Sequence, residues 1–380
     1  MNNKQYNTQY ARRNTQGGFT LVELVVAIGV MSMVVLFAGV VFKTSIASYR
    51  VATAQAEIMQ RFRAITDQLN NDFKGIRKDA PLFIWFQLDP NDHNKRLDQI
   101  MFFADGDFQS TQTYNTYTGP LIYNGSIIPQ PSGSPVLSNL ARIYYGQARS
   151  IDPRDNVLKL PSDPCAFNRI LSRRQHLSIA NPDSGSQYWH FPAYDSSGFL
   201  VVDPVLNDWF EHDTNSLSQW QVVAQNSTNV NTMITRCFGS DTYYSNNRPT
   251  VNLTDANTLN LLMAEKVGSF SVQWSYSYTN AGQTYVYWWP SIDPDGSGNL
   301  ANSDFGKMPT NPFGFYFNTV DPIAPTNSYW FSYLGATGFY YPTIIKPAFP
   351  QAFKFTFTLY DSRGVFKDGQ TFTHIVYIGD

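Results

Sequence analysis

A single charged residue stands inside the most apolar segment of this chain. Residues 19–42 form a predominantly apolar run in which Glu23 is the one charged side chain. At about 1.5 Å of rise per residue, a helix of this length crosses the hydrocarbon layer of a bilayer. A carboxylate there is costly unless it is paired, so a lone one indicates a function. The alternative is an ordinary membrane anchor whose glutamate lies near enough to the interface to stay hydrated.

The apolar run follows a glycine pair, Gly17 and Gly18, and a basic leader. The leader contains three basic residues: Lys4, Arg12 and Arg13. A secretory signal peptide has a shorter apolar core with the cleavage site after it, which is the opposite order. The observed order resembles the class III signal of type IV pilins and pseudopilins. The resemblance implies that a prepilin peptidase cuts between Gly18 and Phe19 and methylates the new N-terminus, while the helix stays in the protein.

Such a cut gives Glu23 a chemical partner. The new amine on Phe19 would lie one helical turn from the carboxylate, and pairing would neutralise both charges. An amine from a neighbouring subunit would also set the register between stacked subunits. We therefore expect Gly18 and Phe19 to act in processing and Glu23 to act in assembly.

The basic leader also predicts the orientation. Lys and Arg residues stay on the cytoplasmic side of a membrane helix, which places everything after Lys43 on the far side. We expect a single-pass protein of the inner membrane with its head in the periplasm.

Charge and composition restrict the class of the head. The chain of 380 residues has a net charge of −2, and acidic residues outnumber basic ones after residue 80. Nucleic-acid binding needs clustered basic charge, so we exclude that class. Aromatic residues make up 16% of the chain and charged residues 15%, which indicates a β-rich extracytoplasmic domain.

Two hydrophobic periods predict the elements. From residue 43 apolar positions recur at steps of three and four: Ile46, Tyr49, Ala52, Ala56, Met59, Phe62, Ile65, Leu69, Phe73 and Ile76. This stripe extends the helix, and no proline interrupts it before Pro81. Beyond it, period-two alternation predicts strands. We expect an α+β fold, in which a long N-terminal membrane-spanning helix packs on a β-sheet-rich, pilin-like head. The expected parts are a leader (1–18), a transmembrane helix (19–42), an amphipathic stem (43–80) and the head (81–380).

Alternation and turn residues give the expected strands of the head. Short apolar runs are 81–88, 99–103 and 142–145. The clearest pattern is a hairpin of residues 270–278 and 285–289, followed near the C-terminus by strands 353–359 and 371–378. The expected loops are 105–135, 181–251 and 291–350.

The order of short motifs in the head narrows the resemblance. The motifs lie at residues 142–145, 169–173, 261–270, 288–290 and 350–356. This order resembles the J-type minor pseudopilin of type II secretion systems, which implies a place in the complex at the tip of the pseudopilus. The implied partners are other minor pseudopilins, the major pseudopilin and the prepilin peptidase. The alternative is a W-type minor type IV pilin whose adhesive head binds a surface or a glycan.

One segment of the head has the residue types of a calcium loop. Residues 293–304 place oxygen side chains at the first, third and fifth positions and glycine at the sixth. The candidate ligands are Asp293, Asp295, Ser297, Asn299 and Asp304. Against calcium, the last ligand is Asp where Glu is usual, and nearby prolines exclude an entering helix. The alternative is a hairpin loop rich in Asx and Gly that binds no metal. Calcium is the one cofactor that the sequence suggests.

The remaining reactive residues favour structure over catalysis. Cys165 and Cys237 are the two cysteines, and in an oxidising compartment we expect them to form a disulfide, with two separate buried thiols as the alternative. The five histidines form no metal or catalytic motif, and no nucleophile elbow or phosphate loop is present. We expect no enzyme. Aromatic residues of the hairpin at 270–289 predict one face in the core, with the other free to bind a partner or a sugar.

Overall fold

The structure is a computed structural model that describes the N-terminal helix and much of the β-rich head. It describes residues 18–89, 91–114, 121–123, 126–128, 134–151, 158–161, 168–178, 212–213, 217–224, 248–254, 256–280, 283–289, 313–317 and 349–378. The chain divides into two compact units, Met1–Thr53 and Ala54–Asp380.

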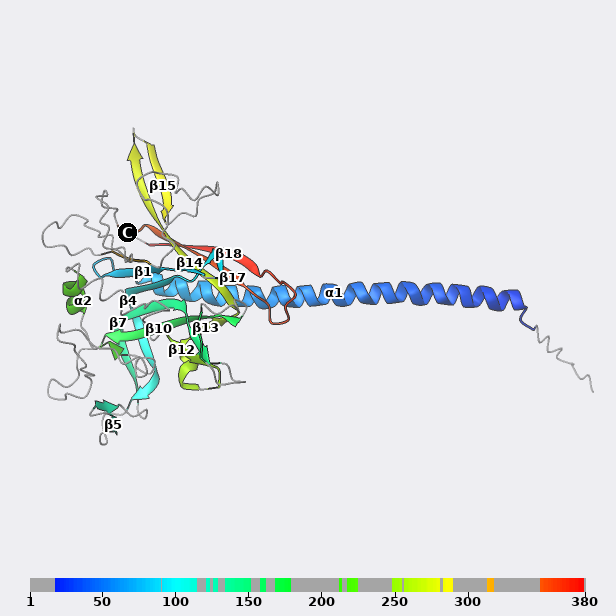
Figure 1. Cartoon of the computed structure of the whole chain (residues 1–380), viewed down its shortest axis with the longest axis horizontal. Helices are drawn as coiled ribbons and strands as arrows, with labels where there is room; N and C mark the ends of the chain where they lie inside the picture. The colour runs from blue at the N-terminus through cyan, green and yellow to red at the C-terminus, as the bar shows by residue number, and fades with distance from the viewer. Residues whose placement is uncertain are drawn as a thin grey trace, which may run out of the picture. The chain divides into compact units, whose positions relative to one another are not determined.

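One helix, α1 (Leu21–Lys74), forms the N-terminal part of the structure. Figure 1 shows it as an uninterrupted helix, as expected for a segment without proline. It ends where Gly75 meets strand β4 (Gln99–Tyr114), and the backbone N–H of Asp105 donates to the carbonyl of Gly75 at 2.7 Å. A Cβ atom at position 75 would lie 1.9 Å from the carbonyl oxygen of Asp105. Only glycine fits this close approach of helix end and strand.

The larger sheet of the head contains seven strands. Along its main path the order is β11, β10, β7, β4, β1 and β16, and β13 pairs with β10 beside β11. The bounds are β11 (His212–Asp213), β10 (Ile170–Ser178), β7 (Ser134–Gln147), β1 (Leu82–Phe86), β16 (Phe313–Phe317) and β13 (Leu262–Glu265). All pairs are antiparallel except β10 with β11.

The second sheet is antiparallel and contains the two hairpins that alternation predicts. Its order is β15, β14, β17, β18, with bounds β15 (Gln283–Trp289), β14 (Val267–Asn280), β17 (Ala352–Leu359) and β18 (Gln370–Tyr377). Trp274 pairs with Trp289 in the first hairpin, and Phe355 with His374 in the second. Both predicted hairpins are confirmed.

Short elements complete the described part of the head. They are β2 (Leu88–Asp89) with β3 (Asp92–Arg96), β5 (Leu121–Tyr123) with β6 (Ser126–Ile128), the sheet of β12 (Thr250–Asn252), β8 (Arg149–Ile151) and β9 (Leu158–Lys159), helix α2 (Leu217–Ala224) and the 3-10 helix η4 (Ala256–Leu261).

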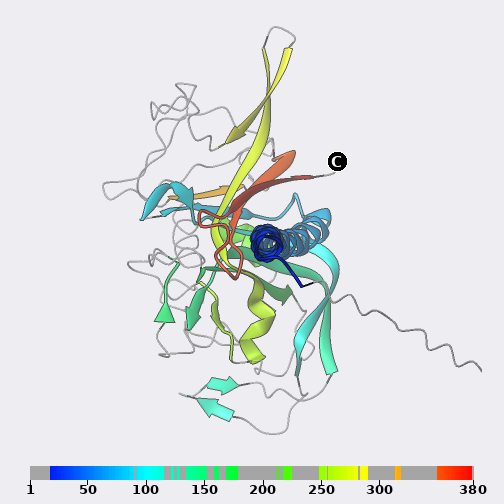
Figure 2. The ribbon, with the colours of Figure 1, turned by 90° about the vertical axis from the view of Figure 1, so that its right-hand side faces the viewer.

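The main core lies between the C-terminal part of α1 and the two sheets. Figure 2 views the head along the helix, with strands of both sheets beside it. Within residues 54–74 of α1 the buried core residues are Ile58, Ile65, Leu69 and Phe73, and they join inward residues of both sheets in one cluster. The ring of Phe73 lies 4.2 Å from that of Phe102 in the larger sheet and 5.3 Å from that of Phe353 in the second. The expected α+β fold with a long apolar helix is confirmed.

A smaller core covers the opposite face of the larger sheet. Trp220 of α2 packs with Phe83, Trp85 and Phe103, which point away from the main core. The rings of Phe103 and Trp220 lie 5.7 Å apart. Both faces of this sheet are therefore buried at β1 and β4, which explains the continuous apolar runs at 81–88 and 99–103.

The three expected loops are wrong in part. Strand β4 continues to Tyr114 and β7 begins at Ser134, so both ends of the expected loop 105–135 are strands. Residue pairing is irregular there, with register shifts between Asp105 and Phe108 and again before Thr113, and a broken register gives no clean alternation. The expected loop 181–251 contains β11, α2 and part of β12, and the expected loop 291–350 contains β16.

Candidate functional site

The start of α1 is closed by a reciprocal cap. Thr20 is the residue before the helix, and its hydroxyl oxygen accepts a hydrogen bond from the backbone N–H of Glu23 at 3.3 Å. In return the backbone N–H and the hydroxyl of Thr20 both donate to Oε2 of Glu23 at 2.9 Å. This is a capping box, in which Thr and a Glu three residues later satisfy helix donors that lack an intrahelical partner.

The cap gives Glu23 a local partner within its own chain. The prediction of pairing with the amine of Phe19 is not tested, because the described chain is intact at Gly18. Sequence reasoning missed Thr20, although the Thr-x-x-Glu spacing is a known signal of a helix start. Cleavage after Gly18 would leave Thr20 and Glu23 in the protein, so the cap is compatible with processing.

The N-terminal half of α1 carries no buried side chain. Every residue from 21 to 52 is exposed, including large apolar ones such as Met31, Leu36 and Phe37. Positions Gly29 and Gly39 have open space around them. Among the described residues, α1 is the one helix long and apolar enough to cross a membrane. This surface needs lipid or other helices to cover it.

The C-terminal half of α1 is held in the head by a buried ion pair. Asp72 is 3% exposed, and its carboxylate accepts two hydrogen bonds from the guanidinium of Arg173 on β10, at 2.6 and 2.8 Å. The hydroxyl of Tyr145 on β7 donates to the same carboxylate, and Gln68 Nε2 donates to it at 3.0 Å. Burial raises the pKa of Tyr145 well above its ordinary value, and the negative charge of Asp72 raises it further. All oxygens of this buried carboxylate are therefore paired.

A second set of polar contacts joins α1 to the turn between β17 and β18. Oε2 of Glu57 accepts a hydrogen bond from the hydroxyl of Ser362 at 2.9 Å, and Arg61 donates to the carbonyl of Tyr360 at 2.7 Å. Arg61 also forms an ion pair with Glu57 at 2.6 Å. Asp361, between them, accepts three backbone N–H groups from its own turn. These contacts fix α1 against the hairpin of β17 and β18.

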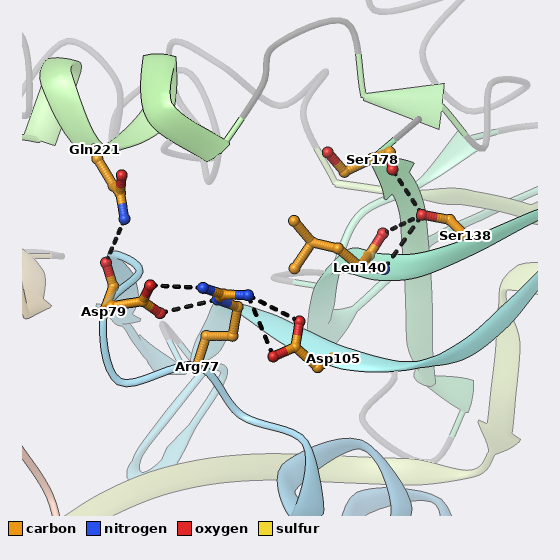
Figure 3. A network of polar contacts seen from close by, with 7 residues as sticks. All are labelled: Arg77, Asp79, Asp105, Ser138, Leu140, Ser178 and Gln221. Atoms are coloured by element: carbon orange, nitrogen blue, oxygen red, sulfur yellow. Dashed lines mark hydrogen bonds and ion pairs between the residues drawn. The ribbon is translucent and has the colours of Figure 1, made fainter. Parts of the chain in front are cut away.

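A more exposed network surrounds the segment after α1 (Figure 3). Arg77 donates to Asp79 at 2.6 and 2.8 Å and to Asp105 on β4 at 3.1 Å, and Gln221 of α2 donates to the backbone carbonyl of Asp79 at 2.7 Å. The hydrogen bonds from Arg77 lower the pKa of Asp79. These charges are partly solvated, so each pair contributes at most about 1 kcal/mol. In the same view the hydroxyl of Ser138 donates to the carbonyl of Ser178, which ties β7 to β10.

Several predicted sites lie outside the described residues. Cys165, Cys237 and the whole of the candidate calcium loop, from Asp293 to Asp304, are among them, so the disulfide and the calcium site stay predictions. Within the described ranges, no group of three His, Cys, Asp or Glu residues is placed to hold a metal ion.

The aromatic hairpin is described in part. Trp274 is buried in the main core at 2% exposure, and Trp288 points to the other face, where it lies half-buried with Nζ of Lys354 4.9 Å from its ring. The side chains of the other hairpin tyrosines lie outside the described part. The expected alternation of core and outer aromatic residues therefore holds at these two positions.

Comparison with known proteins identifies the N-terminal segment. Residues 13–39 match the prokaryotic N-terminal methylation motif. The match includes Gly18 and Phe19, where we expect the cut, the capping residues Thr20 and Glu23, and much of the apolar half of α1. No curated protein and no solved structure matches the chain significantly. The motif and the uncovered apolar helix together indicate a membrane-anchored, type IV pilin-like protein.

Proposed function

We propose that this chain is a minor pseudopilin, a structural subunit that acts by assembly in the inner membrane. The observation that carries the proposal is the apolar N-terminal half of α1, whose side chains are all exposed and whose start is adjacent to Gly18 and Phe19. A surface of this kind is stable in lipid, and it can move from lipid into a bundle of similar helices at little cost because both surroundings are apolar.

The proposed processing follows from the matched motif. A prepilin peptidase cuts between Gly18 and Phe19, and the leader with its basic residues remains on the cytoplasmic side. The new amine then lies beside the capped carboxylate of Glu23. Exchange of the bond from Thr20 for an ionic contact with an amine, from the same or a neighbouring chain, gives Glu23 its assembly role.

The proposed place of the head is the periplasm, at the tip of a type II secretion pseudopilus. The order of head motifs supports the J-type variant, and the two-sheet head supplies a large surface for other minor pseudopilins. The W-type minor type IV pilin with an adhesive head is the alternative. In either role the stem, residues 43–80, connects the membrane helix to the head, and the chain turns over no substrate.

Processing is tested by the mass of the mature protein. In the host we expect an N-terminus at Phe19 carrying a methyl group. Gly18→Val should leave an uncut precursor in the membrane, because the peptidase needs a residue without a side chain there. Gly17→Val is the matched control and should be cut at the same bond. A mature N-terminus elsewhere, or normal cutting of the Gly18→Val protein, would contradict the proposal.

The assembly role is tested by Glu23→Ala in the same host. We expect normal insertion and cutting, because the change removes a charge from an apolar segment. We expect a strong loss of secreted enzymes, since the unpaired amine of Phe19 then disfavours helix packing. Loss of surface pili with normal secretion would instead support the W-type alternative. Normal secretion together with normal pili would contradict an assembly role of Glu23 in either system.

A further inference from the structure

Among the described strands, none pairs with the outer side of β18 (Gln370–Tyr377), which is an edge of the second sheet. It is the last strand in the order β15, β14, β17, β18. The other edge of this sheet is β15, and the larger sheet ends in β16 on one side and in β11 and β13 on the other. An exposed strand edge presents a row of unpaired N–H and C=O groups and is a template for a further strand.

The register with β17 shows which groups of β18 face outward. Ile378 donates to the carbonyl of Gln351 at 2.9 Å, and pairing continues without a shift to Gln370 opposite Leu359. In an antiparallel pair, hydrogen-bonded and non-hydrogen-bonded positions alternate. The backbone groups of Val376, His374 and Phe372 therefore face β17. Four residues present their N–H and C=O groups to the outside: Thr371, Thr373, Ile375 and Tyr377.

None of these outward backbone groups has a hydrogen bond within the described part of the chain. The side chains on this row are also accessible, with Tyr377 77% and Ile375 36% exposed. Natural edge strands are commonly protected by charged residues, proline or a bulge. The strand from Gln370 to Tyr377 has no Lys, Arg, Asp, Glu or Pro and no register shift, so it lacks these protections.

Contacts with α1 hold β18 in place. The ring of Phe372 stacks on that of Phe62 of α1 at 4.8 Å, and Nε2 of His374 lies 2.9 Å from Oδ1 of Asn70. Together with the unbroken pairing to β17, these contacts hold β18 in the extended form that an added strand requires. Docking onto a preformed edge loses little conformational entropy in this chain.

We propose that β18 binds a strand from the head of a different pilin-like subunit, and this rests on the function proposed above. A row of alternating donors and acceptors is complementary to the backbone of an extended strand. The partner strand is uncharged, to match Thr371, Thr373 and Ile375. The pairing adds a defined contact between heads to the contacts between membrane helices.

Symmetric pairing of β18 with the β18 strand of a second copy does not fit this edge. Phe62 meets Phe372 and Asn70 meets His374, so β18 runs in the same direction as residues 62–70 of α1. Two-fold pairing of β18 with itself is antiparallel and would direct the two copies of this helix segment oppositely. Subunits that share the proposed membrane anchor point in one direction, which argues against this symmetric dimer and favours a strand of another subunit as the occupant.

A proline at the edge tests the proposal in the full-length chain. Thr373→Pro removes one outward N–H and places a ring on the edge, while the backbone bonds to β17 are kept. The hydroxyl contact of Thr373 with Thr356 of β17, at 3.4 Å, is lost in this variant and in its control alike. Thr373→Val keeps the N–H and is the matched control. Each tagged variant is co-expressed with every other host protein that carries the same methylation motif, and captured in detergent. We expect the proline variant to capture its partner at least about tenfold less than wild type, and the valine variant to capture it equally.

A second measurement separates edge blocking from misfolding. In the wild-type complex, hydrogen exchange at the amides of Thr371, Thr373 and Ile375 should slow relative to the free chain. Unchanged exchange, or full capture by Thr373→Pro, overturns strand addition while the assembly role stands. Wild type that captures no pilin-like protein overturns the assembly role as well. A self-complex that Thr373→Pro abolishes would show that the occupant is a second copy, contrary to the proposal.

Discussion

The two halves of α1 are built for different surroundings although they form one helix. From residue 21 to 42 apolar side chains occupy all sides, and every residue from 21 to 52 is exposed. From Ala54 onward, apolar residues form a stripe, and the buried members include Ile58, Ile65 and Leu69 at 0% exposure. A helix that is apolar all round needs an apolar solvent, whereas a striped helix needs one covered face. Both halves are helical, so the distribution of apolar residues determines which half suits an apolar solvent and which half packs on the head.

The largest expected effect comes from removing a ring from the striped half. Phe73→Ala empties a site that Phe102, Phe353 and Phe355 surround, and we expect a loss of about 3–5 kcal/mol in the unfolding free energy of the head. The control is Phe37→Ala, which truncates an exposed ring and should change head stability by less than about 0.5 kcal/mol.

Tryptophan fluorescence during urea unfolding in detergent measures both variants. All eight tryptophans follow residue 53, so the signal reports the head alone. Equal losses in the two variants would mean that the halves of α1 are energetically coupled and that the comparison is wrong.

A smaller effect is expected from a change to one carboxylate in each half of the helix. Asp72→Asn keeps the size of a buried side chain but weakens its charge-assisted bonds to Arg173, and we expect a loss of about 1.5–3 kcal/mol. Glu23→Gln is the matched change in the other half and should leave the head unaltered. The urea midpoint of unfolding is measured for both variants. An Asp72→Asn head as stable as wild type would show that the ion pair stabilises the head no more than an amide does.

The smallest effect is a pH dependence from the contact between α1 and β18. Burial lowers the pKa of His374 below its ordinary value, and the nearby Asp67 opposes this only in part. The unfolded chain therefore binds a proton more readily than the folded one, so the contribution of His374 is present above the unfolded pKa of about 6.5 and is lost as pH falls through the folded value. In a comparison of unfolding at pH 7.5 and 5, His374→Gln should lose less stability than wild type. An identical decline in both proteins would contradict this assignment.

The sequence predicted elements wherever one face of a segment is buried. The hairpins at 270–289 and 353–378 alternate strictly because their inward residues, such as Phe270 and Phe355, fill the core at 0% exposure. The ends of β4 and β7 were missed because their register is irregular. Strand β16 was missed because it is short and its pairing with β1 is distant in sequence.

The polar contacts of the site were only partly predictable. Glu23 stands out because it is the one charge in an apolar run, and Asp72 gives a weaker signal as a carboxylate on the apolar stripe between Leu69 and Phe73. Its partners Arg173 and Tyr145 belong to distant strands, and no local pattern connects them. The same is true of Gly75, whose need for glycine comes from the carbonyl of Asp105.

The contact between Glu57 and Ser362 has a consequence for the order of synthesis. These residues are 305 positions apart, and β17 and β18 follow every other described element in the chain. The striped half of α1 therefore leaves the ribosome early, but the part of its apolar face that packs on β17 and β18 stays uncovered until the C-terminal hairpin arrives. Contacts of such long range form slowly and leave apolar surface open to aggregation in the meantime. A chain truncated before β17 would retain its anchor and lose part of the cover of its own helix, so quality control should remove it.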